Sequence, residues 1–253
     1  TPATSNAAAA TNSANALPTA SPTAIATASP GQVPSSSGTV SAAPRENIEV
    51  ETDVLKLSFD SEGGSLVFSE FTKHRDLVDS KKNMVLLDQS SSRVYLAQTG
   101  LIGGDFPTHK APMAFSGERS LKAGQNELTL RFESAEMNGV KLVKTYTLKR
   151  GSYVIDVKHE VVNNGQASVS PQLYMQLVRD GNKPEGESSF YFTFTGPAIY
   201  TDSKKYQKFE FSDIEKNKAE IEKSSPNGYV AMVQHYFATA WLLADGVQRE
   251  NFV

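Results

Sequence analysis

Apolar and polar residues alternate with a period of two over several stretches of the chain, among them residues 55–59, 128–132 and 153–157. Such alternation is typical of β-strands, in which successive side chains point to opposite faces of the sheet. Turn-forming residues accompany the strand signals, as at 60–65 and at Asn138-Gly139, a pair that favours a two-residue hairpin. Together these signals predict roughly a dozen strands.

The late part of the chain adds further strand signals and one helix signal. Residues 188–196 alternate aromatic and polar side chains, and residues 229–243 are long enough for two strands or for one bent strand. A short helix is expected near 213–222 because Ser212 and Glu215 have the spacing of a capping box. Strands do not alternate with helices. The pattern therefore predicts an all-β, mainly antiparallel sandwich with at most one or two short helices.

The first 44 residues differ in composition from the rest of the chain. Of these residues, 34 are Ala, Ser, Thr or Pro, and none is charged or aromatic. Such a segment has too little apolar surface to offset the entropy lost on ordering, and its prolines interrupt helices. We therefore expect residues 1–44 to form a disordered linker and residues 45–253 to form one β-sandwich domain.

Composition excludes several classes of function. The chain has no Cys, so it has no disulfide scaffold, thiol nucleophile or Cys-ligated metal site. Its 25 basic and 28 acidic residues give a net charge of -3, which supplies no positive field for nucleic acid. No run of about 18 apolar residues occurs, so the sequence predicts neither a transmembrane helix nor a signal peptide within it.

Residues able to carry catalysis or bind metal are few and scattered. The four histidines, His74, His109, His159 and His235, lie in different segments and lack metal-binding spacing. Carboxylate pairs such as Asp156 and Glu160 lie on a polar strand face and are interpreted as solvated surface. The sequence therefore predicts no catalytic residue, no cofactor site and no metal site.

One segment, residues 200–211, interleaves aromatic and lysine side chains and is a candidate partner-binding site. Such interleaving can form a stacking surface for a partner, although it is also typical of an edge strand whose lysines prevent aggregation. The candidate residues are Tyr200, Lys204, Lys205, Tyr206, Lys208 and Phe209.

Three separated blocks resemble one protein family in order and spacing. They are IEVETDVLKLSFDSEGGSL at 48–66, LKRGSYVIDVKHEVVNNG at 148–165 and NGYVAMVQHYFATAW at 227–241. Together they resemble the large periplasmic domain of the YidC family of bacterial membrane protein insertases. The Ala-, Pro-, Ser- and Thr-rich linker is similar to the variable segment that follows the first transmembrane helix of that family.

The resemblance implies a fold and a cellular setting. The fold expected is a β-supersandwich similar to those of galactose mutarotase and carbohydrate-binding proteins, on the periplasmic side of the Gram-negative inner membrane. The family inserts nascent membrane proteins through a membrane-embedded part, alone or with the Sec translocon and SecD/SecF. Because the family continues through further strands after the position of Val253, we expect the sandwich to be incomplete at its C-terminal edge.

Three functional hypotheses follow. The leading one is a non-catalytic docking and spacer domain of an insertase, with SecD/SecF and the Sec translocon as partners. The alternative is a module that binds an extended peptide or a glycan through Tyr200, Tyr206 and Phe209. A mutarotase-like enzyme is disfavoured, because none of the four histidines matches a general acid or base of such a site.

Overall fold

The computed structural model describes residues 45–184 and 193–253. Within these ranges it contains sixteen strands and one short helix, and every pairing between named strands is antiparallel. The prediction of an all-β, mainly antiparallel sandwich is confirmed. The predicted linker at 1–44 and most of the strand predicted at 188–196 lie outside the described residues. No described helix has the length and apolar character needed to cross a membrane.

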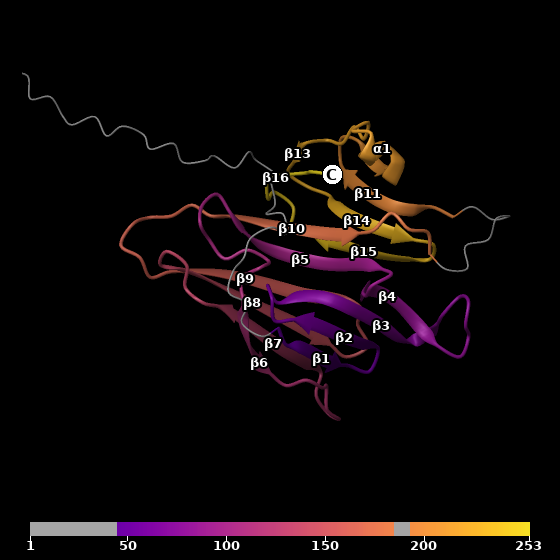
Figure 1. The fold of residues 1–253 in the computed structure, drawn as a ribbon, viewed down its shortest axis with the longest axis horizontal. Coiled ribbons are helices and arrows are strands. Elements are labelled where there is room, and N and C mark those ends of the chain that lie inside the picture. The colour runs from indigo at the N-terminus through magenta and orange to yellow at the C-terminus, as the bar shows by residue number, and fades with distance from the viewer. Residues whose placement is uncertain (1–44, 185–192) are drawn as a thin grey trace, which may run out of the picture.

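The strands form three main sheets and one short pair (Figure 1). In spatial order, the first sheet contains β1 (Asn47–Glu51), β2 (Leu55–Asp60), β3 (Ser65–Arg75), β4 (Asn83–Gln89), β5 (Val94–Ile102) and β10 (Gln172–Arg179). The second sheet contains β6 (Met113–Gly117), β7 (Glu127–Ser134), β8 (Val140–Lys149) and β9 (Ile155–Asn163). The third contains β12 (Lys205–Lys208), β11 (Thr195–Thr201), β14 (Tyr229–Gln234) and β15 (Phe237–Leu242). The short pair is β13 (Ser224–Ser225) with β16 (Arg249–Glu250).

Two apolar cores join these sheets. The larger core lies between the first and second sheets, where the ring centroids of Phe59 and Phe132 are 5.5 Å apart and those of Phe59 and Tyr146 are 4.9 Å apart. The smaller core joins the first and third sheets through residues that include Tyr95 and Met232. Burial of these aromatic side chains accounts for much of the driving force for assembly.

One face of β5 contacts both neighbouring sheets. The Tyr95 hydroxyl donates to the carbonyl of Met232 in the third sheet at 3.1 Å, and the Thr99 hydroxyl hydrogen-bonds His159 in the second sheet at 2.8 Å. Tyr95 and Thr99 are four residues apart on a strand and so point to the same face. The opposite face of the first sheet is therefore turned away from both cores.

Local turn chemistry agrees with the sequence at the hairpins. Asn138 and Gly139 adopt φ values of +49° and +81°, as a two-residue hairpin turn requires, and they join β7 to β8. Residues 229–243 form two strands, β14 and β15, and His235 adopts φ +54° between them.

The helix prediction was wrong in its bounds and in its cap. The helix α1 spans only Phe211–Glu215, and its N-cap is Glu210, which makes no side-chain capping hydrogen bond. Ser212 therefore lies inside the helix. Phe211 packs against the smaller core, which fixes where the helix begins, and Asn217 at φ +53° follows its end. Tertiary packing has overridden the local capping signal.

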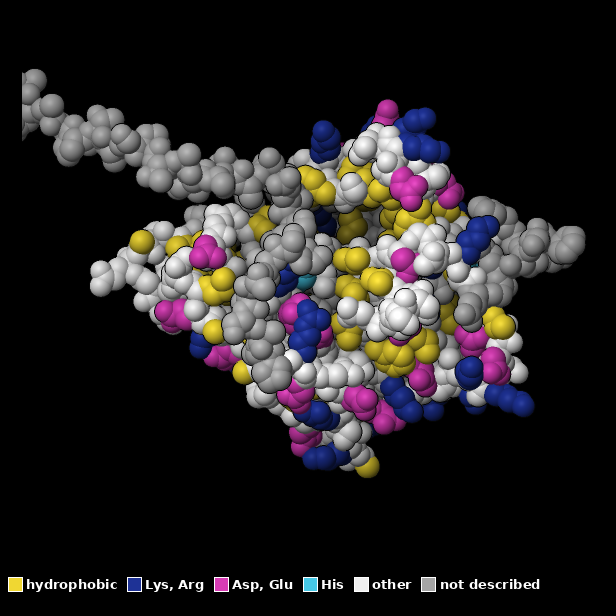
Figure 2. All heavy atoms as spheres, viewed as in Figure 1, with side chains coloured by type: hydrophobic (Ala, Val, Ile, Leu, Met, Phe, Trp, Pro, Cys, Tyr) yellow, Lys and Arg dark blue, Asp and Glu magenta, His cyan; other side chains and the backbone are white. Residues whose placement is uncertain are grey.

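Acidic, basic and apolar side chains are interspersed over the face of the molecule shown in Figure 2, so neither sign of charge dominates it. This agrees with the small net charge of the chain.

Candidate functional site

The predicted interaction segment folds as the β11–β12 hairpin, with β12 at the edge of the third sheet. Lys205 adopts φ +58° at the turn between the two strands. The Glu222 carboxylate accepts hydrogen bonds from the hydroxyl of Ser203 at 2.6 Å and from that of Thr201, which fastens the turn to the following segment. These hydrogen bonds, the one from Ser203 foremost, lower the pKa of the Glu222 carboxyl.

Four side chains lie in register across the third sheet. Tyr206 pairs with Tyr200, Tyr200 with Tyr229, and Tyr229 with Leu242. The rings of Tyr200 and Tyr229 stack with centroids 5.6 Å apart and an interplanar angle of 11°. Tyr206 is 45% exposed and Leu242 is 66% exposed. These four side chains, three aromatic and one aliphatic, are here named the aromatic row. The row Tyr206–Tyr200–Tyr229–Leu242 therefore presents an apolar strip that begins at the sheet edge.

Lysines flank the aromatic row. Lys204, Lys205 and Lys208 are all exposed. The Lys205 ammonium lies 6.0 Å from the ring centroid of Tyr200, and the Lys208 ammonium lies 5.0 Å from that of Phe194. These distances fall within the range of cation–π attraction. Because no ion pair neutralises the three lysines among the described residues, the hairpin presents positive charge beside aromatic surface.

A polar group centred on Lys144 is buried between the first and second sheets. Lys144 on β8 is 0% exposed, and its ammonium nitrogen donates to the carbonyl of Gly63 at 2.5 Å and to that of Thr99 at 2.8 Å. Burial lowers the pKa of Lys144 to about 7. Burial, with a smaller contribution from the Lys144 charge, also lowers the pKa of nearby His159 to about 4. The hydrogen bonds of Lys144 join the two sheets, and its side chain does not reach solvent.

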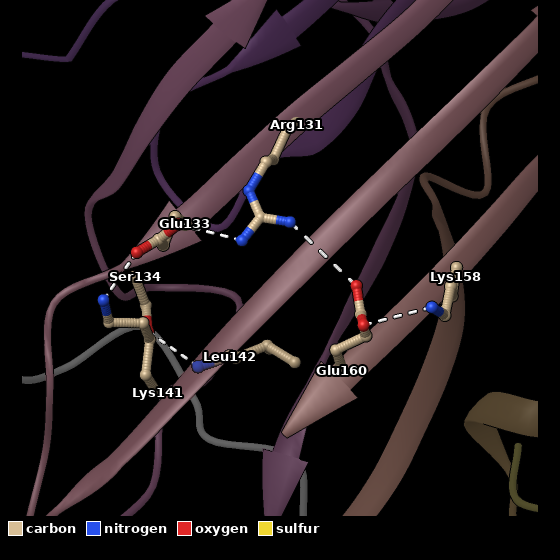
Figure 3. A network of polar contacts seen from close by, with 7 residues as sticks. All are labelled: Arg131, Glu133, Ser134, Lys141, Leu142, Lys158 and Glu160. Carbon is tan, nitrogen blue, oxygen red and sulfur yellow. Dashed lines mark hydrogen bonds and ion pairs between the residues drawn. The ribbon is translucent and has the colours of Figure 1, made fainter. Parts of the chain in front are cut away.

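The outer face of the second sheet carries a network of ion pairs (Figure 3). Glu133 is paired with Arg131 at 3.1 Å and with Lys141 at 2.5 Å, and Glu160 is paired with Lys158 at 3.0 Å and with Arg131 at 4.0 Å. The side chain of Glu160 is 41% exposed. The acidic residues of this face are therefore solvated and ion-paired, as the sequence predicted for Glu160.

Comparison with known proteins identifies the family of the chain. The sequence profile that describes the YidC periplasmic domain matches residues 47–253. The chain belongs to this family. The periplasmic domain of YidC is thus present over nearly all of the described residues, and the resemblance noted in the three sequence blocks is confirmed.

The similar curated proteins are named as membrane protein insertases. The chain is 49% identical over 216 residues to "Membrane protein insertase YidC" of Janthinobacterium sp. (strain Marseille), covering 85% of this chain and 38% of that protein. It is 48% identical over 253 residues to the protein of that name from Bordetella avium, covering 99% of this chain and 44% of the relative. The chain therefore spans less than half the length of these relatives.

The structure places the six predicted residues in different environments within the domain. Tyr200 and Tyr206 share one face, with Lys205 above the Tyr200 ring. Lys204 lies in the turn, where its backbone N–H donates to the Thr201 hydroxyl at 3.2 Å. Lys208 is exposed on the edge strand.

Phe209 behaves differently from the other five. It is half-buried, and its backbone N–H donates to the carbonyl of Pro197 at 3.0 Å. Phe209 therefore closes the base of the hairpin, and of the six predicted residues only the three lysines and Tyr206 are exposed.

Sequence reasoning missed two members of the aromatic row, Tyr229 and Leu242. Both lie in the block 229–243 that was recognised as strand, so their alternation was visible. Their register against Tyr200 depends on pairing between β11, β14 and β15, which no local signal specifies.

Proposed function

We propose that the chain is the non-catalytic periplasmic domain of an inner-membrane insertase that inserts nascent membrane proteins and helps them to fold, alone or with the Sec translocon. The observation that carries this proposal is the match of the YidC periplasmic domain to residues 47–253, together with relatives named as membrane protein insertases. In this proposal residues 1–44 are the linker from the membrane, and residues 45–253 are a docking and spacer domain.

The β11–β12 hairpin is the proposed docking surface for SecD/SecF. An edge strand offers unpaired backbone groups, and lysines along it discourage pairing with arbitrary strands. Lys204, Lys205 and Lys208 add positive charge that would attract an acidic partner surface. Tyr206, 45% exposed, supplies the apolar contact that such interfaces use near their centre.

The hydrogen bonds of the four histidines support the non-catalytic role, because each ring is held by a hydroxyl group of the fold. Each of the four hydrogen-bonds a different hydroxyl group, those of Tyr153, Tyr174, Thr99 and Thr193. Among the described residues, no group of three or more His, Cys, Asp or Glu side chains is arranged to hold a metal ion. A mutarotase-like reaction would need an acid and a base that converge on one substrate.

The test is co-purification of SecD/SecF with the chain after replacing Lys204, Lys205 and Lys208 by Glu. Charge reversal should abolish binding, because three attractive contacts become repulsive. The matched control replaces three other exposed lysines, Lys73, Lys81 and Lys82, by Glu and should leave binding unchanged. Equal binding by both triple variants would discard the hairpin as the docking surface while leaving the family assignment intact.

The alternative function, binding of an extended peptide or glycan through the hairpin aromatics, rests on the exposure of Tyr206. Phe209 supports it less, because it is half-buried at the hairpin base. Saturable binding in a peptide library or glycan array that is lost in Tyr206→Ala would favour this alternative over docking.

A further inference from the structure

Three turns from three different sheets meet at one end of the molecule. They are residues 76–82 between β3 and β4, residues 150–154 between β8 and β9, and residues 235–236 between β14 and β15. Figure 1 shows the first and the third of these turns at the right of the view. Segments that are far apart in the chain therefore share one surface.

A cluster of four rings holds the three turns together. The Phe71 ring lies at its centre, and its centroid is 5.3 Å from that of Tyr153, 5.5 Å from that of Phe237 and 5.9 Å from that of His74. The Tyr153 hydroxyl is hydrogen-bonded to Nε2 of His74 at 3.1 Å. His74 precedes the first turn, Tyr153 belongs to the second and Phe237 follows the third. The cluster therefore fixes the turns relative to one another.

Large apolar side chains project from the tips of these turns and are here named the tip patch. They are Leu77, Val78, Tyr153, Val154 and Tyr236, with exposed fractions between 43% and 78%. Single exposed apolar side chains are common, but a group of them at one end of a protein marks a surface that contacts something apolar.

The backbone at the tips is already hydrogen-bonded within the turns. The Asp76 carboxylate accepts the N–H groups of Val78 and Asp79 at 2.8 and 2.9 Å. The Ser152 hydroxyl accepts the N–H of Val154 at 3.1 Å. Moving a backbone donor out of water is costly unless it keeps a partner. The tips can therefore enter the boundary region of a bilayer without losing these hydrogen bonds.

The charge of the first turn favours an anionic surface. Lys73, Lys81 and Lys82 lie on either side of the turn and are exposed. Among the described residues, Lys73 and Lys81 form no ion pair, and Lys82 pairs with Asp79 at 3.6 Å. The carboxylates of Asp76 and Asp79 accept backbone N–H groups of the turn, that of Asp79 from Lys81 at 3.0 Å. The lysines therefore dominate the outward charge, which complements anionic lipid headgroups.

The chemistry of the tip patch fits a lipid surface better than a folded partner protein. Tyrosine rings favour the level of the headgroups, where one end of the ring is apolar and the other is wet. Protein interfaces instead have a densely packed core of matching shape. The tips lie on three separate turns, with Ser80 and Ser152 beside them, and each tip can enter the headgroup layer without a complementary surface.

We propose that this end of the domain rests on an anionic lipid bilayer. The tip patch lies among the headgroups, and Lys73, Lys81 and Lys82 lie against the lipid phosphates. The contact is peripheral and fixes the orientation of the domain on the membrane surface. It goes beyond docking to SecD/SecF, because none of the three turns includes a residue of the β11–β12 hairpin.

The experiment is co-sedimentation of the full chain with vesicles of equal parts phosphatidylglycerol and phosphatidylethanolamine. We expect binding that weakens as salt is raised and that is at least about tenfold weaker with phosphatidylcholine vesicles. Leu77→Ser/Val78→Ser should lower the affinity for anionic vesicles about tenfold, because it removes apolar contact at exposed positions. Replacing Lys73, Lys81 and Lys82 by Glu should lower it about a hundredfold.

The matched control replaces the three hairpin lysines by Glu, which makes the same change of charge at the edge of the third sheet. This variant should bind anionic vesicles as the unaltered chain does. The two triple variants should thus have opposite effects on vesicle binding and on co-purification of SecD/SecF, so either proposal can fail without the other.

A second measurement locates the contact on the molecule. Because the chain has no Cys, Val78→Cys can carry a single nitrobenzoxadiazole dye. Emission of the dye should shift to shorter wavelength when anionic vesicles are added. The same dye at Val162→Cys, an exposed position near the far end of β9, should show no shift.

Three results would overturn the proposal: no binding to anionic vesicles, equal loss of binding in both triple variants, or equal dye shifts at the two positions. Self-association of the chain that disappears in Leu77→Ser/Val78→Ser, without binding to vesicles, would also overturn it. That result would show that the tip patch joins two copies of the chain.

Discussion

Replacing Lys144 with Met tests how the first and second sheets are joined. The amine is fully buried and donates to two backbone carbonyls, those of Gly63 and Thr99, and among the described residues it has no carboxylate partner. Burial lowers its pKa from 10.5 to about 7, because the charged form loses its hydration. In the unfolded chain the amine remains protonated up to its ordinary pKa. Folding at a pH between these two pKa values therefore releases a proton.

The sign of the pH dependence follows from this release. Where the unfolded state binds more protons than the native state, the free energy of unfolding rises with pH. With each pKa unit worth about 1.4 kcal/mol, Lys144 should raise the free energy of unfolding by about 2 kcal/mol between pH 7 and 9. Burial raises the pKa of Tyr146 well above its ordinary value, so stability falls again once unfolded tyrosines ionise near pH 10. The useful window therefore ends at about pH 9.

Urea denaturation across this window is the assay. The unaltered chain should gain about 2 kcal/mol, whereas Lys144→Met should show no such rise. At pH 9 the variant should be the less stable protein, because each carbonyl that loses its donor costs about 1–3 kcal/mol. The control Lys158→Met alters a side chain that is 70% exposed and should keep the rise. A variant that retains the full rise, or an unaltered chain without one, would refute the assignment to Lys144.

Three further predictions concern stability. Because the pKa of His159 is lowered to about 4 in the folded chain, the unfolded chain takes up the proton first below about pH 6.5, and the free energy of unfolding falls. His159→Gln should remove this loss, which is about 2–3 kcal/mol between urea titrations at pH 7 and at pH 4.5. Gly228→Ala should destabilise by more than about 2 kcal/mol, because its φ is +93° and the new Cβ would lie 1.8 Å from the Tyr200 carbonyl oxygen. Gly124→Ala, at φ +83° with nothing within 4 Å, should cost only the backbone strain of about 1 kcal/mol, and equal losses in the two alanine variants would exclude the clash. Phe132→Ala, at 0% exposure, should cost about 3–5 kcal/mol by thermal or urea unfolding, and a loss below about 1 kcal/mol would contradict the described core.

The strands could be predicted because their signal is local. Alternation in 55–59 and 128–132 depends only on neighbouring residues, and the Asn138-Gly139 turn requires positive φ values that these two residues adopt readily. The capping signal at Ser212 was equally local but failed, because packing of Phe211 on the smaller core determines where α1 begins. Local signals therefore identify elements more reliably than their ends.

The aromatic row depends on register between distant strands. Tyr200 and Tyr206 are close in sequence, and their shared face could be predicted from the hairpin. Tyr229 and Leu242 join them only through pairing across β14 and β15.

Lys144 links three segments that are distant in the sequence. The alternation of Lys144 with Leu142 and Tyr146 places its side chain on the apolar face of β8. The sequence does not reveal its acceptors, which lie 81 and 45 residues away. Gly63, whose carbonyl Lys144 holds, packs so closely on His109 that an added Cβ would lie 2.1 Å from the His109 carbonyl oxygen.

Lys144 therefore holds the Gly63 turn from the core side, and the turn packs against the His109 backbone. The Gly63 N–H donates to the Ala111 carbonyl at 2.8 Å, so Lys144→Met should speed amide hydrogen exchange of Gly63 about threefold to tenfold, because the turn loses one of its anchors. The same measurement with Lys158→Met should give the rate of the unaltered chain. Unchanged exchange in Lys144→Met, measured at a pH where the variant is fully folded, would show that packing on His109 alone holds the turn.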